Sequence, residues 1–282
     1  MLRRALENQF LRRGLQYDVY EASGAEDLSC LVRSVGAGYD VCVAAGGDGT
    51  VSAVAHALVE LQVPLGIIPI GTANTLAREL GIPLAVDKAC ALIAGEHGLL
   101  RIDAMLVAGR YRVLNVSAGF TALTMRDTTG ESKRRLGTAA YIWTGLRALA
   151  GSQPVRFRLQ VDGRPLSLGG SDVLVVNGTT PVQSFVRPGY SHRLDDGELG
   201  VYVLRCRTIG DYLVSALRLL QDGRARDPRV RFFPARQKVH IASEPAVPVQ
   251  ADGDYIGQTP VEVTLVPKAV SVIVPLRAAA GP

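Results

Sequence analysis

The chain has 282 residues, 48% of them hydrophobic and 20% charged, which is typical of a soluble globular protein with one large or two ordinary domains. Its formal net charge of +5 at pH 7 favours an acidic partner, whereas 6% aromatic residues and the lack of any binding-module spacing argue against nucleic acid. No apolar run reaches the roughly 18 residues of a membrane-spanning helix, the N-terminus lacks the apolar core of a signal peptide, and the 4 cysteines are scattered. We therefore expect a cytoplasmic protein without a zinc or disulfide framework.

Residues 1–103 alternate apolar strands with helical patterns. In chain order, the predicted elements are a strand at 39–47, a helix at 51–61, a strand at 64–71 and helices at 74–81 and 85–96. In the first helix, an apolar face is formed by Val51, Val54, Ala55 and Leu58. This alternation predicts a parallel sheet with crossover helices.

Beyond residue 103 the chain is predicted to consist mainly of short strands. They are expected at 101–107, 111–119, 155–163, 172–178, 198–206, 238–243, 248–255, 261–267 and 270–276. Hairpin turns are predicted at 108–110 and 162–163, and helices near 133–150 and 208–221. We expect no internal repeat. The pattern indicates an α/β domain followed by a β-rich domain.

A glycine-rich turn follows the first predicted strand. Gly46, Gly47 and Gly49 allow a tight backbone whose N–H groups can approach a polyphosphate, and the helix that begins near Thr50 adds its positive end. Asp48 would repel a phosphate directly, so it is sensible only if a cation or a proton to be moved stands between them. Many glycine turns are simple connections, but the aspartate favours chemistry at this one.

The next strand is followed by a similar turn. Gly71 and Thr72 lie between a buried strand and a helix, where amides and a hydroxyl can hold a further phosphate oxygen. Asn74 is interpreted as a polar contact in the first helical turn or as an ordinary helix cap. Because the carboxyl ends of adjacent parallel strands meet, we expect the two turns to share one crevice.

Five segments together carry a family resemblance. They are GGDGT at 46–50, PIGTANTLARELGIP at 69–83, RIDAM at 101–105, RLDDGELGVYVL at 193–204 and ADGDYIG at 251–257. In this order they resemble the diacylglycerol kinase and sphingosine kinase catalytic family, in particular the bacterial soluble lipid kinases of the diacylglycerol kinase B and YegS group. The first segment is shared with NAD kinases, and the second and fourth favour the lipid branch.

The resemblance implies a fold, domain boundaries and cofactors. The N-terminal domain would be α/β, with the parallel sheet of NAD kinase and diacylglycerol kinase, and the C-terminal domain would resemble a β-sandwich. We expect a nucleotide-binding domain at 1–103, with 273–282 as a candidate addition, and a lipid-acceptor domain at 104–272. ATP and Mg²⁺ are the implied cofactors. Compared with the family, the chain begins in what resembles the helix after the first strand, so that strand is expected to be missing.

The resemblance also assigns roles to residues of the first domain. Nucleotide phosphates would be held by Gly46, Gly47, Gly49, Thr50 and Thr72, beside the nucleotide contacts already expected from Gly71 and Asn74. Asp48, with a catalytic role as well, and Asp103 would belong to a magnesium and water network. From the residues alone, Asp103 is an unremarkable carboxylate at a strand end.

In the second domain the resemblance implies a proton acceptor and a structural metal. The acceptor would be Asp254, which stands where the family has glutamate, with Asp252 as the second candidate. The metal would be held by the side chain of Asp196 and the backbone carbonyls of Arg193 and Glu198. Both segments contain Asp-Gly, however, and are open to interpretation as simple turns.

The implied function is an ATP-dependent kinase that phosphorylates a diacylglycerol-like lipid alcohol. We expect peripheral contact with the anionic inner membrane surface, through basic clusters at 132–135, 156–158 and 223–231 that are otherwise a solvated surface. The alternatives are a kinase of a soluble acceptor such as NAD, or a catalytically silent nucleotide- or lipid-binding protein. A homodimer is left open. His56, His97, His192 and His240 show no ligand spacing and are expected to be structural or surface residues.

Overall fold

The chain forms two compact units in a computed structural model, which describes residues 2–21, 28–119, 122, 155–178, 193–206, 210–211 and 228–276. The α/β unit is Met1–Ala104 with Pro267–Pro282, and the β unit is Met105–Val266. Two strands contribute residues to both units, β3 (Gly98–Val107) and β14 (Val261–Val274). Among the helices in the described ranges, none has the length and hydrophobicity of a membrane-spanning segment.

The α/β unit contains a small parallel sheet. Strand β1 (Cys42–Gly46) pairs in parallel with β2 (Leu65–Pro69), and β2 pairs in parallel with the last part of β14. All five residues of β2 are buried, as expected for a strand that is covered on both faces. The parallel sheet predicted from the alternating strands and helices is therefore confirmed.

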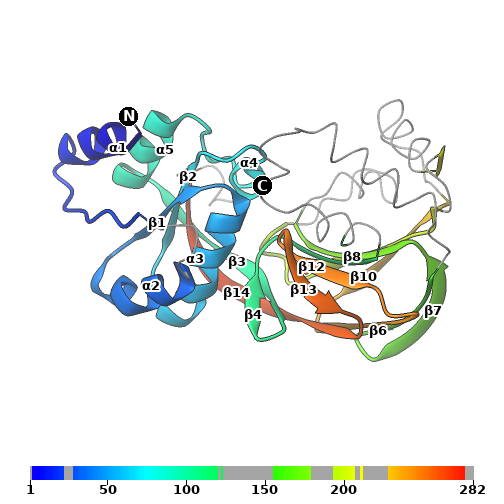
Figure 1. Ribbon diagram of the computed structural model, residues 1–282. Coiled ribbons are helices and arrows are strands. Elements are labelled where there is room, and N and C mark those ends of the chain that lie inside the picture. The colour runs from blue at the N-terminus through cyan, green and yellow to red at the C-terminus, as the bar shows by residue number, and fades with distance from the viewer. Residues whose placement is uncertain are drawn as a thin grey trace. The chain divides into compact units, whose positions relative to one another are not determined.

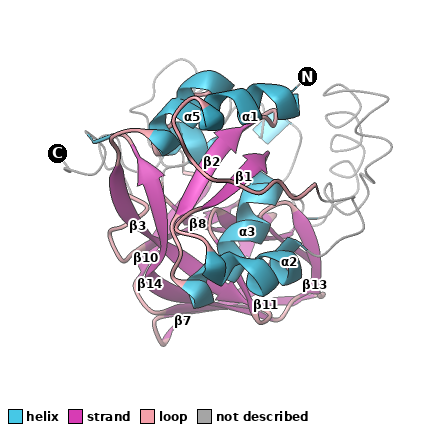
Figure 2. Cartoon of the chain, turned by 90° about the vertical axis from the view of Figure 1, so that its left-hand side faces the viewer, coloured by secondary structure: helices cyan, strands magenta, loops and turns pink. Residues whose placement is uncertain are grey.

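Two pairs of helices lie on opposite sides of β1 and β2 (Figures 1 and 2). One pair is α1 (Leu2–Leu11) with α5 (Val86–Ala94), and the other is α2 (Leu28–Val35) with α3 (Asp48–Leu61). The short elements are the 3₁₀ turn η1 (Gly36–Gly38) and helix α4 (Thr75–Glu79). The predicted apolar face of α3 is buried, because Val51, Val54, Ala55 and Leu58 are at most 6% exposed.

The β unit contains strands of two sheets (Figure 1), which pair antiparallel within each of the β-hairpins and between β11 and its neighbours β6 and β14. One contains β11 (Lys238–Glu244), β6 (Val155–Val161), β7 (Arg164–Gly170), β4 (Arg110–Arg112) and parts of β3 and β14. The other has the order β10 (Val230–Ala235), β9 (Leu199–Leu204), β8 (Asp172–Asn177), β5 (Asn115–Gly119), β12 (Pro248–Ala251) and β13 (Asp254–Gln258).

One apolar core joins the two sheets of the β unit. Alternate residues of β6 are buried, namely Phe157, Leu159 and Val161, and the residues between them face outward. They belong to the same cluster as Val201 of β9 and other side chains of the second sheet. Two sheets that share one core through alternating residues form a β-sandwich, as predicted.

Several predicted elements differ from the structure or lie outside the described residues. The strands predicted at 261–267 and 270–276 are one continuous strand, β14, because Pro267 and Lys268 interrupt the apolar alternation without ending it. Strand β10 was not predicted, and its first two residues, Val230 and Arg231, belong to the basic cluster at 223–231. The helix expected near 133–150 lies outside the described residues, as does nearly all of the one expected near 208–221.

Candidate functional site

The two predicted glycine turns touch each other through their backbones. A Cβ atom added to Gly71 would lie 2.4 Å from the Cα of Gly47, a distance that no real side chain shows. The Ile70 N–H also donates to the Gly46 carbonyl at 3.1 Å, which extends the β1–β2 pairing to the point where both strands end. The carboxyl ends of β1 and β2 therefore meet in one backbone-lined region, as the sequence predicts.

The first turn leads directly into helix α3. Gly47 is the N-cap residue, and the first helical hydrogen bond runs from the Val51 N–H to the Gly47 carbonyl at 3.1 Å. The amides of Asp48, Gly49 and Thr50 thus lie in the first turn, where backbone N–H groups have no helical acceptor. Gly49 is exposed, and a Cβ added there would meet no atom within 4 Å. This end of α3 is open and carries the positive end of the helix dipole.

Gly46 has a different role from Gly49. A Cβ added to Gly46 would lie 2.4 Å from both Cβ and Oγ1 of Thr50, so the threonine side chain packs directly against the glycine backbone. This packing requires glycine at 46 and places the Thr50 hydroxyl beside the end of β1. The spacing of the GGDGT segment therefore has a steric basis that does not depend on any ligand.

Asp48 connects the starts of two helices. Its Oδ1 accepts the Leu76 N–H at 3.3 Å, and its Oδ2 accepts the Thr75 hydroxyl at 3.4 Å, both from the first turn of α4. Asp48 is itself the first residue of α3. One carboxylate therefore lies at the positive ends of both helix dipoles. An aspartate in this glycine turn thus has a structural explanation in addition to the predicted catalytic one.

Asn74 closes the second turn. It occupies the N-cap position of α4 but makes no side-chain cap bond there. Instead its Nδ2 donates to the Gly71 carbonyl at 2.8 Å, and its Oδ1 accepts the Gly71 N–H at 3.0 Å. Arg78, to which sequence reasoning gave no separate role, adds a bond from Nε to the Ala73 carbonyl at 2.9 Å. Thr72 is exposed between these contacts.

Asp103 is fully buried and bonded to the backbone. Its Oδ1 accepts the Lys268 N–H at 2.7 Å, at a point where Lys268 has a φ of 50°. The carboxylate thereby supports an irregular position of β14. A buried acid with this contact does not fit direct ligation of a magnesium ion, which prefers to keep several water ligands.

The RLDDGE turn is closed by Asp196. Its Oδ2 accepts the Arg193 N–H and its Oδ1 accepts the Glu198 N–H, each at 3.0 Å. Asp195 pairs with Arg193 at 2.9 Å, and this hydrogen bond raises the pKa of the Arg193 guanidinium above its ordinary value. Glu198 pairs with Arg236 at 3.1 Å. The contacts match an aspartate-closed turn, which is the simpler of the two interpretations of this segment.

The ADGD segment is the hairpin turn between β12 and β13. Asp252 and Gly253 have φ values of 49° and 89°, as in the two-residue turns that favour Asp-Gly. Asp252 is 8% exposed, and its carboxylate accepts the N–H groups of Val113 at 2.9 Å, Leu114 at 3.0 Å and Asn115 at 2.9 Å. Both oxygens of the Asp252 carboxylate therefore accept hydrogen bonds from the backbone.

Asp254 stands at the exposed end of the same turn. Its side chain is 64% exposed, and its Oδ2 accepts a hydrogen bond from Nη1 of Arg112 at 2.8 Å. Behind the turn, Gln250 accepts the Gly253 N–H at 2.8 Å and donates to Asn115 at 2.7 Å and to Ser117 at 2.8 Å. Sequence reasoning missed Arg112 and Gln250. Gln250 lies directly beside the predicted acids, whereas Arg112 has no signal near them in the sequence.

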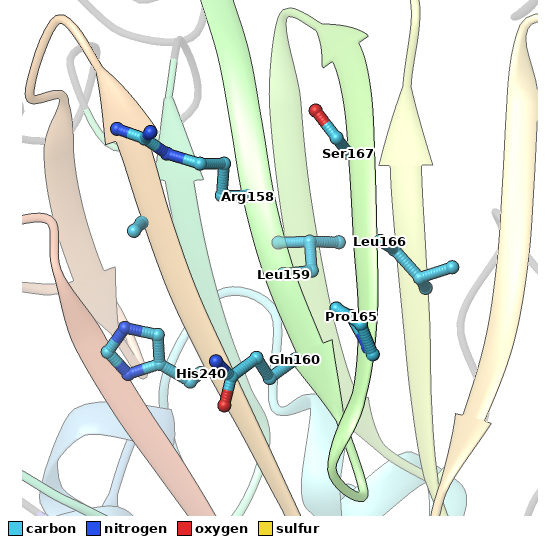
Figure 3. Close-up of a pocket in the computed structure, with 8 residues that line it drawn as sticks. Arg158, Leu159, Gln160, Pro165, Leu166, Ser167 and His240 are labelled. Carbon is cyan, nitrogen blue, oxygen red and sulfur yellow. The ribbon is translucent and has the colours of Figure 1, made fainter.

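A shallow hollow of ≈ 470 Å³ lies elsewhere, on the outer face of β6, β7 and β11 (Figure 3). It is lined by Arg158, Leu159, Gln160, Pro165, Leu166, Ser167, His240 and Ala242. None of these is a predicted site residue, and Arg158 is paired with Glu244 at 3.0 Å. No group of three or more His, Cys, Asp or Glu residues with metal-binding geometry occurs in the described ranges.

Among the described residues, only some arginines of the basic clusters are free of an ion pair and exposed for contact with an anionic surface. Arg158 of the 156–158 cluster pairs with Glu244, and Arg229 of the 223–231 cluster pairs with Asp211 at 3.0 Å. Arg156 and Arg231 are exposed. The cluster at 132–135 lies outside the described residues, as does His192.

Two family models together match most of the chain. The diacylglycerol kinase catalytic domain matches residues 2–107, and the YegS C-terminal NAD kinase beta sandwich-like domain matches residues 114–274. Among solved structures, a diacylglycerol kinase from Bacillus anthracis has a TM-score of 0.72 at 21% identity, over 97% of this chain and 89% of that chain. This likeness shows that the fold is shared.

Sequence relatives point to the same family. A diacylglycerol kinase of Bacillus subtilis is 30% identical over 244 residues, which cover 84% of this chain and 78% of that protein. One from Staphylococcus carnosus is 27% identical over 254 residues, covering 88% and 81%. An uncharacterized protein of Synechocystis is 30% identical over 249 residues, and the chain spans 57% of its length. The chain therefore belongs to the diacylglycerol kinase family, and it is a phosphotransferase with a catalytic domain followed by a YegS-type β-sandwich domain.

Proposed function

We propose that the chain transfers the γ-phosphoryl group of ATP to the hydroxyl of a diacylglycerol-like lipid, with Mg²⁺ as the cofactor. The observation that carries the proposal is the backbone contact between Gly47 and Gly71 at the ends of two parallel strands. Gly47 is the N-cap of α3 and Gly71 directly precedes Thr72, so the contact joins the two turns. Backbone amides at such a helix start are suited to phosphate oxygens.

The donor phosphates would be held by groups from both turns. The amides of Asp48, Gly49 and Thr50 point out of the first turn of α3, and the open space at Gly49 leaves room for an oxygen. Thr72 adds an exposed hydroxyl. Asn74 would act indirectly, because both ends of its amide are bonded to Gly71 and fix the turn.

Asp48 fits a magnesium ion that is shared with the phosphates. Magnesium in phosphoryl-transfer sites is commonly bound through one or two carboxylates, substrate phosphates and water. Asp48 is only half-buried, and its two bonds to α4 are long, at 3.3 and 3.4 Å. When bound, the ion would neutralise charge on the transferring group. Asp103 would support the fold at β14 rather than the ion.

The proton of the attacking alcohol would pass to Asp254. During transfer the alcohol oxygen bonds to the γ-phosphorus, the bond to the β-phosphate oxygen breaks to release ADP, and the hydroxyl proton moves to the Asp254 carboxylate. Asp254 is favoured over Asp252 because its side chain is 64% exposed, whereas the carboxylate of Asp252 already accepts hydrogen bonds from three backbone N–H groups. Asp252 would hold the turn that presents Asp254.

The proposed acceptor is a lipid, which is the chemistry named for the relatives. The decisive experiment incubates the protein with labelled ATP and Mg²⁺, and with diacylglycerol, monoacylglycerol, sphingosine, ceramide or phosphatidylglycerol in mixed micelles. Label should appear in a lipid product. Label in NAD without lipid would instead support the kinase of a soluble acceptor. No product with any acceptor, together with measurable ATP binding, would indicate a silent binding protein.

The role of Asp254 has its own test. Asp254→Asn should abolish transfer, because the amide cannot accept the hydroxyl proton, while ATP affinity measured by calorimetry stays close to that of the parent chain. Glu244→Gln is the matched control, since it also removes an exposed carboxylate that pairs with an arginine of the β unit. Retained turnover in Asp254→Asn would refute the assignment.

A further inference from the structure

The β unit contains the same hairpin device twice. The segments LQVDGR at 159–164 and VQADGD at 249–254 both end a strand with a two-residue Asp-Gly turn. Their φ values agree closely, at 48° and 80° for Asp162 and Gly163 and at 49° and 89° for Asp252 and Gly253. One copy belongs to each sheet of the sandwich.

The two aspartates make equivalent contacts. Asp162 accepts the N–H groups of three successive residues, 236 to 238, at 2.8, 2.9 and 3.0 Å. Asp252 accepts those of residues 113 to 115 at 2.9, 3.0 and 2.9 Å. The N–H of each aspartate donates to the carbonyl of the third residue, Lys238 or Asn115, at 2.9 Å. We call each arrangement an Asp-Gly clamp.

The strand pairing of the clamps corresponds residue by residue. In the first, Val161 of β6 lies opposite Val239 of β11. In the second, Ala251 of β12 lies opposite Val116 of β5. Residues 235–240 therefore correspond to residues 112–117. The first clamp includes no predicted site residue, so it shows what the device does when it serves the fold alone.

The copies differ where the second carries a candidate catalytic acid. Beyond the Asp-Gly turn the first copy has Arg164 and the second has Asp254. The position that precedes the clamped amides is Ala235 in the first copy and Arg112 in the second. In the second copy these two changed positions form the ion pair at 2.8 Å. The two clamps therefore share their backbone geometry, and only the second carries an acid and an arginine that pair with each other.

We propose that Arg112 is a positioning residue that fixes the carboxylate of Asp254 for phosphoryl transfer, and that Asp252 is a structural clamp. The inference rests on the proposed function. The Arg112 side chain is only 9% exposed, whereas that of Asp254 is 64% exposed, so a largely buried guanidinium holds an exposed carboxylate. The hydrogen bond from Arg112 to Oδ2 restricts the rotation of the Asp254 side chain. The other carboxylate oxygen, Oδ1, would then accept the proton of the alcohol. Correct placement of a reacting group by about 1 Å is worth about 10²-fold in rate.

The test compares Arg112→Met with Arg112→Lys and with the control Arg33→Met, which breaks an ion pair with Glu60 outside the predicted site residues and basic clusters. Arg112→Met should lower kcat about 10²-fold with the KM for ATP nearly unchanged, because placement and not binding is lost. Arg112→Lys should recover part of this loss, and Arg33→Met should match the parent chain.

Two stability measurements separate this inference from the proposed function. Asp252→Asn and Asp162→Asn should lower the urea midpoint similarly, and Arg112 and Asp254 should show coupling in a double-mutant cycle of urea midpoints. If the parent chain transfers no phosphoryl group, the proposed function fails, and the cycle still tests the pair. An unchanged kcat in Arg112→Met, or no coupling in the cycle, would overturn the positioning role. A folded Asp252→Asn variant that loses kcat as fully as Asp254→Asn would overturn the clamp assignment.

Discussion

Gly47 and Gly71 are in direct backbone contact, so a Cβ added at 71 would overlap Gly47, and one added at 47 would be tight, at 3.3 Å from the Cα of Gly71. The Cβ of an alanine at 71 would lie 2.4 Å from the Cα of Gly47 and 2.9 Å from Oδ1 of Asn74. The strand ends β1 and β2 would have to separate to admit it. Glycine is therefore required sterically at position 71, at the same strand ends where we propose that the phosphates bind.

Gly71→Ala should therefore damage both stability and nucleotide binding. We expect a loss of about 3 kcal/mol in the free energy of unfolding, because overlap with backbone is not relieved by rotating a side chain. ATP affinity should fall as the two turns separate. Gly38→Ala is the control in the same unit, since a Cβ there meets no atom within 4 Å. Denaturant unfolding and calorimetry check both effects, and normal ATP affinity in Gly71→Ala would contradict the shared site.

Two substitutions at Asn74 should distinguish the contribution of its donor group, Nδ2, from that of its acceptor, Oδ1. Asn74→Asp keeps an acceptor for the Gly71 N–H but places a carboxylate oxygen near the Gly71 carbonyl, where the amide now donates at 2.8 Å. Asn74→Gly loses both bonds but suits the left-handed backbone at φ 49°. We expect each to lose about 1 to 2 kcal/mol of stability.

ATP titrations should distinguish the two Asn74 variants. Asn74→Asp should weaken ATP binding more, since it adds negative charge beside the proposed phosphate site. Equal ATP affinity in the two variants would mean that the added charge lies too far from the phosphates to matter.

The Asp162 clamp predicts a defined pH dependence of stability. Burial opposes ionisation of this carboxyl, but the amides of residues 236 to 238 outweigh it and lower its pKa below the ordinary value of 3.8. A group whose pKa is lowered by folding stabilises the folded state above its unfolded pKa, and the stabilisation disappears as the pH falls through the folded pKa.

Asp162→Asn should accordingly be less stable than the parent chain by about 2 kcal/mol at neutral pH, since three bonds to a charged acceptor are weakened. The difference should persist down to about pH 4 and shrink below it. Urea unfolding of both proteins across this range measures it. A difference that stays constant down to the lowest accessible pH would show that the charge of Asp162 is irrelevant. Transfer activity at neutral pH should match that of the parent chain.

Binding to anionic vesicles should weaken as salt is raised. Exposed arginines such as Arg156 and Arg231 each contribute about 1 kcal/mol near an anionic surface, and salt screens this attraction. Sedimentation with vesicles that contain phosphatidylglycerol, at low and high salt, measures the effect. Neutral phosphatidylcholine vesicles are the control. Binding that does not change with salt would exclude an electrostatic contact with the membrane.

Local patterns predicted the fold well. The apolar face of α3 and the alternation along β6 follow directly from residue periodicity, and both are buried as expected. The Asp-Gly hairpin at 162–163 follows from turn chemistry. The break predicted in β14 was wrong because the pairing of neighbouring strands carries the strand past Pro267 and Lys268.

The candidate site was less predictable because its contacts are remote in sequence. Asp48 bonds to the start of α4, and Asp103 bonds to Lys268, so neither partner is visible from the local motif. Arg112 and Asp254 are separated by 142 residues. The segments around Asp162 and Asp252 do resemble each other in sequence, but a six-residue similarity gains meaning only when both are seen to bind three amides.

The position of Asp48 has a thermodynamic consequence for the proposed reaction. Its negative charge already occupies the region where two helix dipoles converge, so an incoming polyphosphate meets a resident anion as well as attractive amides. A divalent cation that joins the two anions would convert repulsion into attraction. Nucleotide affinity should then rise with cation concentration, and by reciprocity the nucleotide should tighten cation binding by the same factor.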